Sequence, residues 1–170
     1  MTKIIIQDNI LTNDEAYKAH EFFFVVHKGN NLNNWISKED WEKLTFIKKI
    51  TETASSYFDL SSCAGYEWWI HSEGSLPPRG WHKDLDEKHW ADHYELKYPL
   101  CSIIYYPLIQ DLQGGHFLTE DVKIAPKTNR TIFMESEQWH NVEPYQNGRW
   151  SILINPWSYK LDWAQETFKR

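Results

Sequence analysis

The 170-residue sequence has little cysteine, no long apolar run and no cluster of basic residues. Two cysteines, Cys63 and Cys101, are too few for a disulfide scaffold, although they could form one bridge. No apolar run reaches the roughly 20 residues of a membrane-spanning helix, and the start, "MTKIIIQDN", lacks the apolar core of a secretory signal. We therefore expect a soluble, intracellular protein of the cytoplasm.

The charge balance argues against polyanionic partners. The sequence holds 18 basic and 24 acidic residues, for a net charge of −6. Nucleic acids and anionic membranes are bound by clustered Lys and Arg side chains, so we predict no nucleic-acid and no membrane partner. Aromatic residues are abundant instead, with 10 Trp, 9 Tyr and 8 Phe. Such rings can fill a core or form the rigid walls of a cavity.

The first 60 residues are predicted to form one strand and two helices. "KIIIQD" indicates a short strand, and "TNDE" at 12–15 is a capping box that opens a helix ending at Gly29. The asparagine-rich "GNNLNN" indicates a loop. A second cap, at 37–40, opens a helix whose apolar residues keep helical spacing as far as Phe58.

After about residue 60 the pattern changes to short strands rich in aromatic and β-branched residues. They are "AGYEWWIH", "YPLCSIIYYP", "GGHFLTE", "RTIFME", "QWHNVEPY" and "RWSILINPW", separated by the turn signals "SEGSLPPRG", "QDLQGG", "APKTNR" and "QNG". No helical stretch alternates with them, which argues against a parallel βαβ sheet. We expect an α+β fold with a β core, an antiparallel barrel or jelly roll with helices packed outside. The chain is predicted to be one domain, 1–170, with supporting elements in 1–60 and the core in 61–157.

The stretch "GWHKDLDEKHW" holds two candidate metal ligands, His82 and Asp84. Residues i and i+2 of a strand face the same way, so this imidazole and this carboxylate would converge on one point. A third ligand is needed. His140 lies in the alternating "QWHNVEP", late in the chain, where it could meet the first pair across a barrel.

The other histidines and carboxylates have simpler explanations. We expect His71 and His116 to be structural, hydrogen-bonded near strand ends. His89 and His93, four residues apart, could form a metal pair on a helix, but a solvated loop or helix face is favoured. A polar loop at the mouth of the site is expected to contain Asp86, Glu87, His89 and Asp92.

Two histidines and one carboxylate form the ligand set of non-heme Fe(II) oxygenases, although zinc hydrolases use the same residues. Arg149 and Ser151 follow His140 by nine and eleven residues and share one strand face. A guanidinium beside a hydroxyl suits the two-point binding of a carboxylate. The alternative explanation is a surface arginine beside a strand serine.

Together, H-x-D, a later histidine and R-x-S resemble the iron- and 2-oxoglutarate-dependent dioxygenases, in particular their prolyl 4-hydroxylase-like branch. The similarity extends to "DNILTNDEA", "SIIYYPLIQDLQGGHFL" and "VKIAPKTNRTIFMESEQWHNVEP". It is strong from Trp81 to Trp157 and looser before that. The segment from Leu85 to Pro99 departs from the family pattern, as does "YYPL", where relatives often have asparagine after the strand.

The resemblance implies an enzyme that hydroxylates an unactivated C–H bond with Fe(II), 2-oxoglutarate and O2, releasing succinate and CO2. It implies that the catalytic iron ligands are His82, Asp84 and His140. The far carboxylate of 2-oxoglutarate would be held by Arg149, Ser151 and Tyr106, with Tyr105 as the other choice for the tyrosine. The substrate stays open between a peptidyl proline, a free amino acid and another small molecule.

The distance between Arg149 and His140 along the chain favours one of the two β folds, the jelly roll. If "QNG" closed a flat hairpin, Arg149 would lie beside the turn and His140 six or more residues away. That is about 20 Å, too far for an arginine and a five-carbon diacid to bridge. We therefore expect the two strands in different sheets of a double-stranded β-helix rather than neighbours in an up-and-down barrel.

Two other functions fit part of the sequence. A non-catalytic jelly roll could bind carbohydrate or protein through exposed Trp and Tyr rings. A cupin-like metalloenzyme could use the same three ligands without 2-oxoglutarate. The R-x-S pair argues against both, because neither needs a buried carboxylate-binding arginine.

Overall fold

The computed structural model describes residues 3–27, 33–72 and 80–168, and within them the strands form a seven-stranded and a three-stranded sheet. The large sheet has the order β1-β7-β4-β9-β3-β2-β10, and the small sheet has the order β6-β5-β8. The large sheet comprises β1 (Ile4–Asp8), β2 (Asn34–Ser37), β3 (Gly65–His71), β4 (Ser102–Gly114), β7 (Arg130–Met134), β9 (Tyr145–Trp157) and β10 (Gln165–Glu166). The small sheet comprises β5 (Phe117–Thr119), β6 (Lys123–Ile124) and β8 (His140–Val142).

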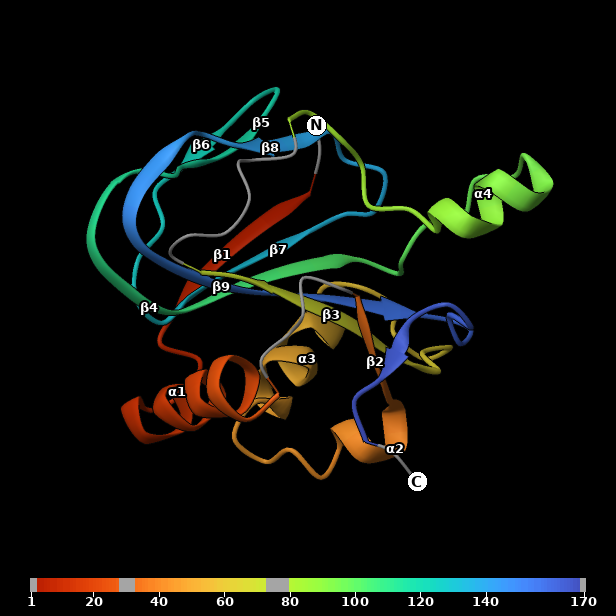
Figure 1. Cartoon of the computed structure of the whole chain (residues 1–170), viewed down its shortest axis with the longest axis horizontal. Coiled ribbons are helices and arrows are strands. Elements are labelled where there is room, and N and C mark those ends of the chain that lie inside the picture. The colour runs from red at the N-terminus through yellow and green to blue at the C-terminus, as the bar shows by residue number, and fades with distance from the viewer. Residues whose placement is uncertain (1–2, 28–32, 73–79, 169–170) are drawn as a thin grey trace.

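The helical elements are α1 (Asn13–His20), the π-helical η1 (Glu21–Val26), α2 (Lys38–Trp41), α3 (Lys48–Ser55) and α4 (Glu87–His93). Helices α1, α2 and α3 lie on one side of the large sheet and the small sheet lies on the other, while α4 projects at the edge of the molecule (Figure 1). Pairing is antiparallel except between β10 and β2. The predicted α+β class with a β core is confirmed, and the architecture is a double-stranded β-helix.

Alternation along β4 divides the core into two parts. Ile103 and Tyr105 face the helices, in a large apolar cluster that includes Phe23 and Trp41. Ile104 and Tyr106 face the small sheet and pack in a second cluster with residues such as Phe117. Successive residues of a strand point to opposite faces, so one strand supplies both layers.

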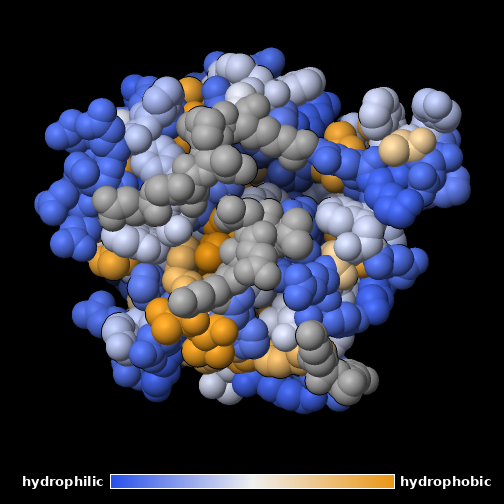
Figure 2. Space-filling model, viewed as in Figure 1, coloured by the Kyte–Doolittle hydropathy of each residue, from blue (hydrophilic) through white to orange (hydrophobic). Residues whose placement is uncertain are grey.

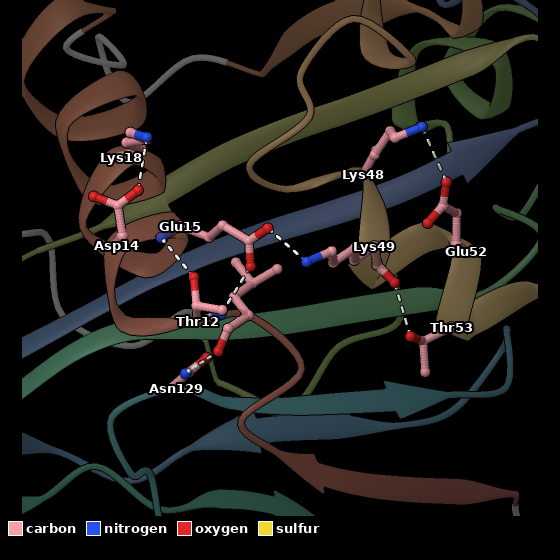
Figure 3. A network of polar contacts seen from close by, with 10 residues as sticks. Thr12, Asp14, Glu15, Lys18, Lys48, Lys49, Glu52, Thr53 and Asn129 are labelled. Atoms are coloured by element: carbon pink, nitrogen blue, oxygen red, sulfur yellow. Dashed lines mark hydrogen bonds and ion pairs between the residues drawn. The ribbon is translucent and has the colours of Figure 1, made fainter.

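Polar contacts hold the first helix in place (Figure 3). Thr12 and Glu15 form the predicted capping box of α1, which satisfies two backbone N–H groups at its first turn. Glu15 also accepts from Lys49 of α3 at 2.6 Å. Asn129, just before β7, donates to the Leu11 carbonyl at 2.7 Å. The helical layer is therefore tied to the sheet at the start of α1.

Several predicted boundaries were wrong. The loop predicted after the first helix gives way at residue 34 to β2, and the Gly29 end of that helix lies outside the described residues. The second predicted helix is two short helices, α2 and α3, with turns at 42–47 between them. Its predicted cap at Ser37 is confirmed, since this hydroxyl accepts from the Asp40 N–H at 3.2 Å.

The predicted turn "QNG" and all of "QDLQGG" except its last glycine lie inside long strands. The register between β4 and β9 shifts between Gln110 and Gln113. Asp111 and Asn147 have positive φ angles of 51° and 70°, and Asn147 Nδ2 donates to the Asp111 carbonyl at 2.8 Å. Turn-forming residues here make a bulge that bends the strand pair. The chain instead crosses between the sheets at 143–144, as the distance argument requires.

Both cysteines are buried free thiols, so the possible disulfide does not form. Burial raises the pKa of Cys101 to about 12. Hydrophilic residues cover most of the face that Figure 2 shows. Among the described residues, none of the helices has the length and apolar character needed to cross a bilayer.

Candidate metal and cosubstrate site

A pocket of about 440 Å³ is lined by residues of both sheets and of the segment between β3 and α4. The lining residues of β3 and of β9 all have odd numbers, because alternate side chains of a strand face the same way. From β3 these are Glu67, Trp69 and His71, and from β9 they include Arg149, Leu153 and Asn155.

The three predicted metal ligands meet in this pocket. Ligand atoms of His82, Asp84 and His140 all lie within 4.8 Å of one another. Asp84 Oδ1 lies 3.9 Å from His82 Nε2 and 3.7 Å from His140 Nε2. A two-residue antiparallel bridge between the backbones of His82 and His140 brings distant parts of the chain together. Two imidazoles and a carboxylate suit Fe(II), and they also suit Zn(II).

Hydrogen bonds set the tautomers of both histidines. His82 Nδ1 lies 2.7 Å from the Gly80 carbonyl oxygen, and His140 Nδ1 lies 2.9 Å from the Gln138 carbonyl oxygen. Because a carbonyl can only accept, each Nδ1 carries the proton in the neutral ring. Each Nε2 lone pair is then directed to the point where the ligands converge, as a metal requires.

Ser102 of β4 orients the carboxylate. Its hydroxyl donates to Asp84 Oδ2 at 2.7 Å, while Oδ1 is the oxygen that approaches the two imidazoles. Such a partner fixes which carboxylate oxygen faces the metal. The donor set, its tautomers and its supporting hydrogen bonds therefore fit a divalent metal ion.

Arg149 lies in the same pocket and is only 2% exposed. Its Nη1 donates to Ser151 Oγ at 2.9 Å, its Nη2 to the Tyr106 hydroxyl at 3.2 Å and its Nε to the Gly115 carbonyl at 3.2 Å. These bonds use three of the five guanidinium N–H groups. The structure thus brings together the three residues predicted to bind 2-oxoglutarate.

No carboxylate of the described residues lies within ion-pair distance of the Arg149 guanidinium. A buried cation without a counter-ion is costly, whereas the same cation beside a bound anion is stabilised. The contacts to Tyr106 and Ser151 are neutral and leave the charge uncompensated. The site can therefore accept an anionic group such as a carboxylate.

Gly115 allows the chain to approach Arg149 closely. Its φ is +72°, and a Cβ at this position would meet Arg149 Cδ and Tyr145 Cβ at 3.1 Å each. Glycine is the residue that adopts positive φ without steric cost. The second glycine of the predicted "GGHFLTE" strand therefore has a specific place beside the arginine.

Tyr105 and Tyr106 point to opposite faces of the large sheet, and only one of them can contact Arg149. Tyr106 turns its hydroxyl to Arg149, whereas the Tyr105 hydroxyl donates to Asn129 Oδ1 at 3.1 Å on the other side of the sheet. The sequence prediction preferred Tyr106, and the structure places that residue beside Arg149.

His71 was predicted to be structural, but it lines the pocket. Burial, together with the positive charge of Arg149, lowers the pKa of His71 to about 4. The ring is therefore neutral near pH 7 and can hydrogen-bond a ligand without adding charge. Its partner in the β3–β9 ladder is Ser151. The two-residue spacing of Glu67, Trp69 and His71 within "GYEWWIH" could have revealed this wall.

Glu67 and Asn155, also missed in the sequence, face each other across the ladder in the same pocket. Burial raises the pKa of Glu67 to about 7, against the lowering effect of hydrogen bonds from Trp157 and Asn33, while the charge of Asp84 raises it further. The Trp157 indole N–H donates to Glu67 Oε2 at 2.9 Å. A carboxylate is therefore held at a second position in the pocket.

The polar loop predicted at the mouth is mostly α4, and one member was assigned wrongly. Asp86 is buried, caps α4 through the His89 N–H, and accepts from the Tyr159 hydroxyl and the Trp163 indole at 3.0 Å each. It is therefore structural rather than solvated. His89 and His93 lie on α4 with their ring centroids 4.5 Å apart, outside the metal-ligand group found among the described residues.

His116 was predicted to be structural and hydrogen-bonded near a strand end. It lies one residue before β5, with its Nδ1 2.7 Å from Glu143 Oε2. Glu87 and Asp92 of α4 are exposed, and Glu87 also lines the pocket.

No family model matches the chain, and no curated protein matches its sequence. Solved structures match in fold. A viral collagen prolyl hydroxylase from Paramecium bursaria Chlorella virus-1, in complex with 2-oxoglutarate, is 17% identical with a TM-score of 0.60, over 90% of this chain and 94% of that one.

Two further matches are also prolyl hydroxylases with low sequence identity. A Trichoplax adhaerens prolyl hydroxylase, in complex with a peptide of hypoxia inducible factor, is 14% identical with a TM-score of 0.61, over 91% of this chain and 83% of that one. A Pseudomonas putida prolyl-4-hydroxylase is 15% identical with a TM-score of 0.60, over 92% and 93%. The resemblance predicted from the sequence is thus confirmed in three dimensions, and the chain has the double-stranded β-helix fold of these prolyl hydroxylases.

Proposed function

We propose that this chain is an Fe(II)- and 2-oxoglutarate-dependent dioxygenase that hydroxylates an unactivated C–H bond and releases succinate and CO2. The observation that carries the proposal is the buried, uncompensated Arg149 in the same pocket as the metal-ligand group. A metal-binding group alone would fit several metalloenzymes. The additional anion site distinguishes an enzyme that binds a dicarboxylate beside its metal.

In this proposal His82, Asp84 and His140 hold the metal, and the Gly80, Gln138 and Ser102 contacts keep their donor atoms aimed at it. Arg149 binds the far carboxylate of the cosubstrate, with Ser151 and Tyr106 fixing the plane of the guanidinium. When bound, the iron, 2-oxoglutarate and O2 supply the oxidising power that replaces a C–H bond with C–OH.

The rest of the pocket excludes water and positions the ligands. Phe117 stacks on the His140 ring with centroids 5.5 Å apart and is fully buried. Trp69 and Leu153 face each other on adjacent strands and supply apolar wall between the two ends of the pocket. A dry, rigid surround strengthens the electrostatic contacts inside it.

The competing functions are less well supported. A sugar-binding module would gain nothing from a buried arginine or from two histidines with matched tautomers. A cupin-like metalloenzyme without 2-oxoglutarate would explain the ligand group but not the anion site.

The test is metal loading combined with cosubstrate turnover. Iron-loaded wild-type protein should bind 2-oxoglutarate and convert it slowly to succinate under O2. Asp84→Ala should lose both metal and turnover, and His82→Ala should behave similarly. His89→Ala is the matched control and should keep wild-type metal content. If the metal-loaded wild type does not bind 2-oxoglutarate, the proposal is wrong.

A further inference from the structure

The pocket has chemically opposite ends along the β3–β9 ladder. His71 and its partner Ser151 lie beside Arg149, whereas Glu67 and its partner Asn155 lie four residues further along both strands. At the strand rise this separation is about 13 Å. One end therefore carries a buried cation and the other a buried carboxylate.

The side chains that donate to the Glu67 carboxylate are neutral among the described residues. Trp157 Nε1 donates to Oε2, and Asn33 Nδ2 donates to Oε1. In the part of the chain that the structure describes, no Lys, Arg or His lies within ion-pair distance of it. Glu67 is 3% exposed. A buried carboxylate is strongly stabilised when a cation joins it.

Asn155 adds an unused acceptor. Asn155 is the partner of Glu67 in the β3–β9 ladder, and both residues line the pocket. The Asn155 Oδ1 is buried and has no hydrogen-bond partner among residues 3–27, 33–72 and 80–168. A buried acceptor without a donor is unfavourable by itself, so this oxygen is ready to accept from a bound ligand.

The surrounding walls suit the same kind of ligand. Trp69 and Trp163 line the pocket together with Glu67 and Asn155. Indole faces attract cations, and the Trp163 ring is held in place by its bond to Asp86. A carboxylate, an open amide oxygen and aromatic rings together are complementary to a positively charged group with several N–H donors.

We propose that Glu67 and Asn155 form the substrate-recognition end of the pocket and bind a protonated amine, so that the substrate is a basic amino acid or a lysyl-type side chain. This proposal rests on the proposed oxygenase function, because only an enzyme has a substrate. A peptidyl proline has no N–H to offer the open Asn155 oxygen and no charge for Glu67. The reacting carbon would lie between the amine and the metal ligands, while Arg149 holds the anionic cosubstrate.

The test uses zinc-loaded, 15N-labelled protein with 2-oxoglutarate present, so that binding is observed without turnover. The reporter is the indole N–H signal of Trp157, which donates directly to Glu67. The probes are butylamine and its neutral counterpart 1-butanol. They are compared at pH 8, where butylamine is protonated and Glu67, whose pKa is raised to about 7, is ionised. In the wild type we expect butylamine to shift the Trp157 signal at concentrations at least tenfold lower than 1-butanol.

Glu67→Gln keeps the size of the side chain and removes its charge, so it should erase the preference for butylamine. Asn155→Ala removes the open acceptor and should weaken butylamine binding about threefold to tenfold, more than it weakens the binding of 1-butanol, which has a single O–H donor and no charge. Glu120→Gln, at an exposed carboxylate outside the pocket, is the matched control and should retain the full preference. If Glu67→Gln does not fold, the Asn155→Ala comparison decides.

Two further probes separate the sources of the amine. Free L-lysine and acetyl-Gly-Lys-Gly-amide carry the same side chain, and tighter binding of either supports the proposal while identifying the source. Equal wild-type affinities for butylamine and 1-butanol would overturn it. If that happens while 2-oxoglutarate still binds, only the recognition of amines fails and the oxygenase assignment stands. If the protein prefers butylamine but does not bind 2-oxoglutarate, the amine site stands and the oxygenase assignment fails.

Discussion

Arg149 Nη2 donates to the hydroxyl of Tyr106 at 3.2 Å, and the guanidinium carbon lies 5.1 Å from the centre of the same ring. Tyr145 approaches the guanidinium from another direction, with 5.4 Å to its ring centre. These contacts, together with Ser151, fix the orientation of the charge before any ligand binds. Fixed charges bind their partners with less loss of conformational entropy.

Removing the guanidinium should weaken 2-oxoglutarate binding by about two orders of magnitude, since charge-assisted hydrogen bonds contribute about 1.5–3 kcal/mol each. We expect this of Arg149→Ala, with an intermediate effect for Arg149→Lys, which keeps the charge but loses the fork. Calorimetric titration of 2-oxoglutarate and metal analysis of both variants provide the measurement. Metal content should not change, because Arg149 is not a ligand.

Arg130→Ala is the matched control for Arg149. This arginine bonds Asp8 near the surface and should not affect cosubstrate affinity. Unchanged 2-oxoglutarate affinity in Arg149→Ala would contradict the anion site.

Ser102→Ala should weaken metal binding about tenfold without abolishing it. The hydroxyl holds Asp84 Oδ2, and loss of such a supporting hydrogen bond typically costs 10–100-fold in metal affinity. Competition with a chelator measures the change. Ser55→Ala, on the exposed face of α3, is the control and should bind metal like the wild type. An equal affinity in Ser102→Ala would show that Asp84 needs no orienting partner.

The pKa of Glu67, raised to about 7, predicts a specific dependence of stability on pH. The folded state holds this proton up to about pH 7, whereas the unfolded state releases it near 4.5. The folded state therefore binds more protons between these values, and this group makes the free energy of unfolding fall as pH rises from 4.5 to 7. The difference between these two pKa values limits the contribution of Glu67 to the free energy of unfolding to about 3 kcal/mol.

Chemical denaturation of metal-free protein at pH 5 and pH 7.5 tests this prediction. The wild type should lose more stability across this interval than Glu67→Gln does, because glutamine does not titrate. His71 contributes in the opposite direction, since its lowered pKa makes the folded state resist protonation as pH falls below 6.5. That contribution is common to both proteins and cancels. Parallel pH profiles would contradict the raised pKa.

Asp86→Ala should destabilise the fold by about 2–4 kcal/mol. The substitution removes a helix cap and leaves the Tyr159 hydroxyl and the Trp163 indole without an acceptor, each a cost of about 1 kcal/mol or more. The free energy of unfolding from urea titration is the measurement. Asp92→Ala, at an exposed position on the same helix, should change it by less than about 0.5 kcal/mol. A similar small change for Asp86→Ala would mean that these bonds are dispensable.

The sequence singles out three side chains that the structure brings together, because spacing is local information. His82 and Asp84 are two residues apart, and R-x-S lies on one strand face, so their relative facing follows from the strand period. The same reasoning found the capping box at Thr12. The β-helix followed from one distance argument about His140 and Arg149, which the crossing at 143–144 satisfies.

The missed features depend on long-range packing. Asp86 looks like any acidic residue of a polar loop until Tyr159 and Trp163, more than 70 residues away, are folded against it. The bulge at Asp111 and Asn147 uses the residue types of a turn, so composition alone cannot separate the two. His71 was assigned a structural role because its single strand reveals nothing of the arginine it faces.

Asp86 lies two residues after Asp84 and connects this central segment to the C-terminal part of the described chain. Its bonds to Tyr159 and Trp163 connect the segment that carries two metal ligands to the last part of the described chain. Coupling between two such events is reciprocal. Metal binding should therefore slow amide hydrogen exchange around 159–166, and removal of those residues should weaken metal binding, although none of them approaches the metal ligands in sequence. The C-terminal segment thus takes part in the thermodynamics of a site to which it contributes no ligand.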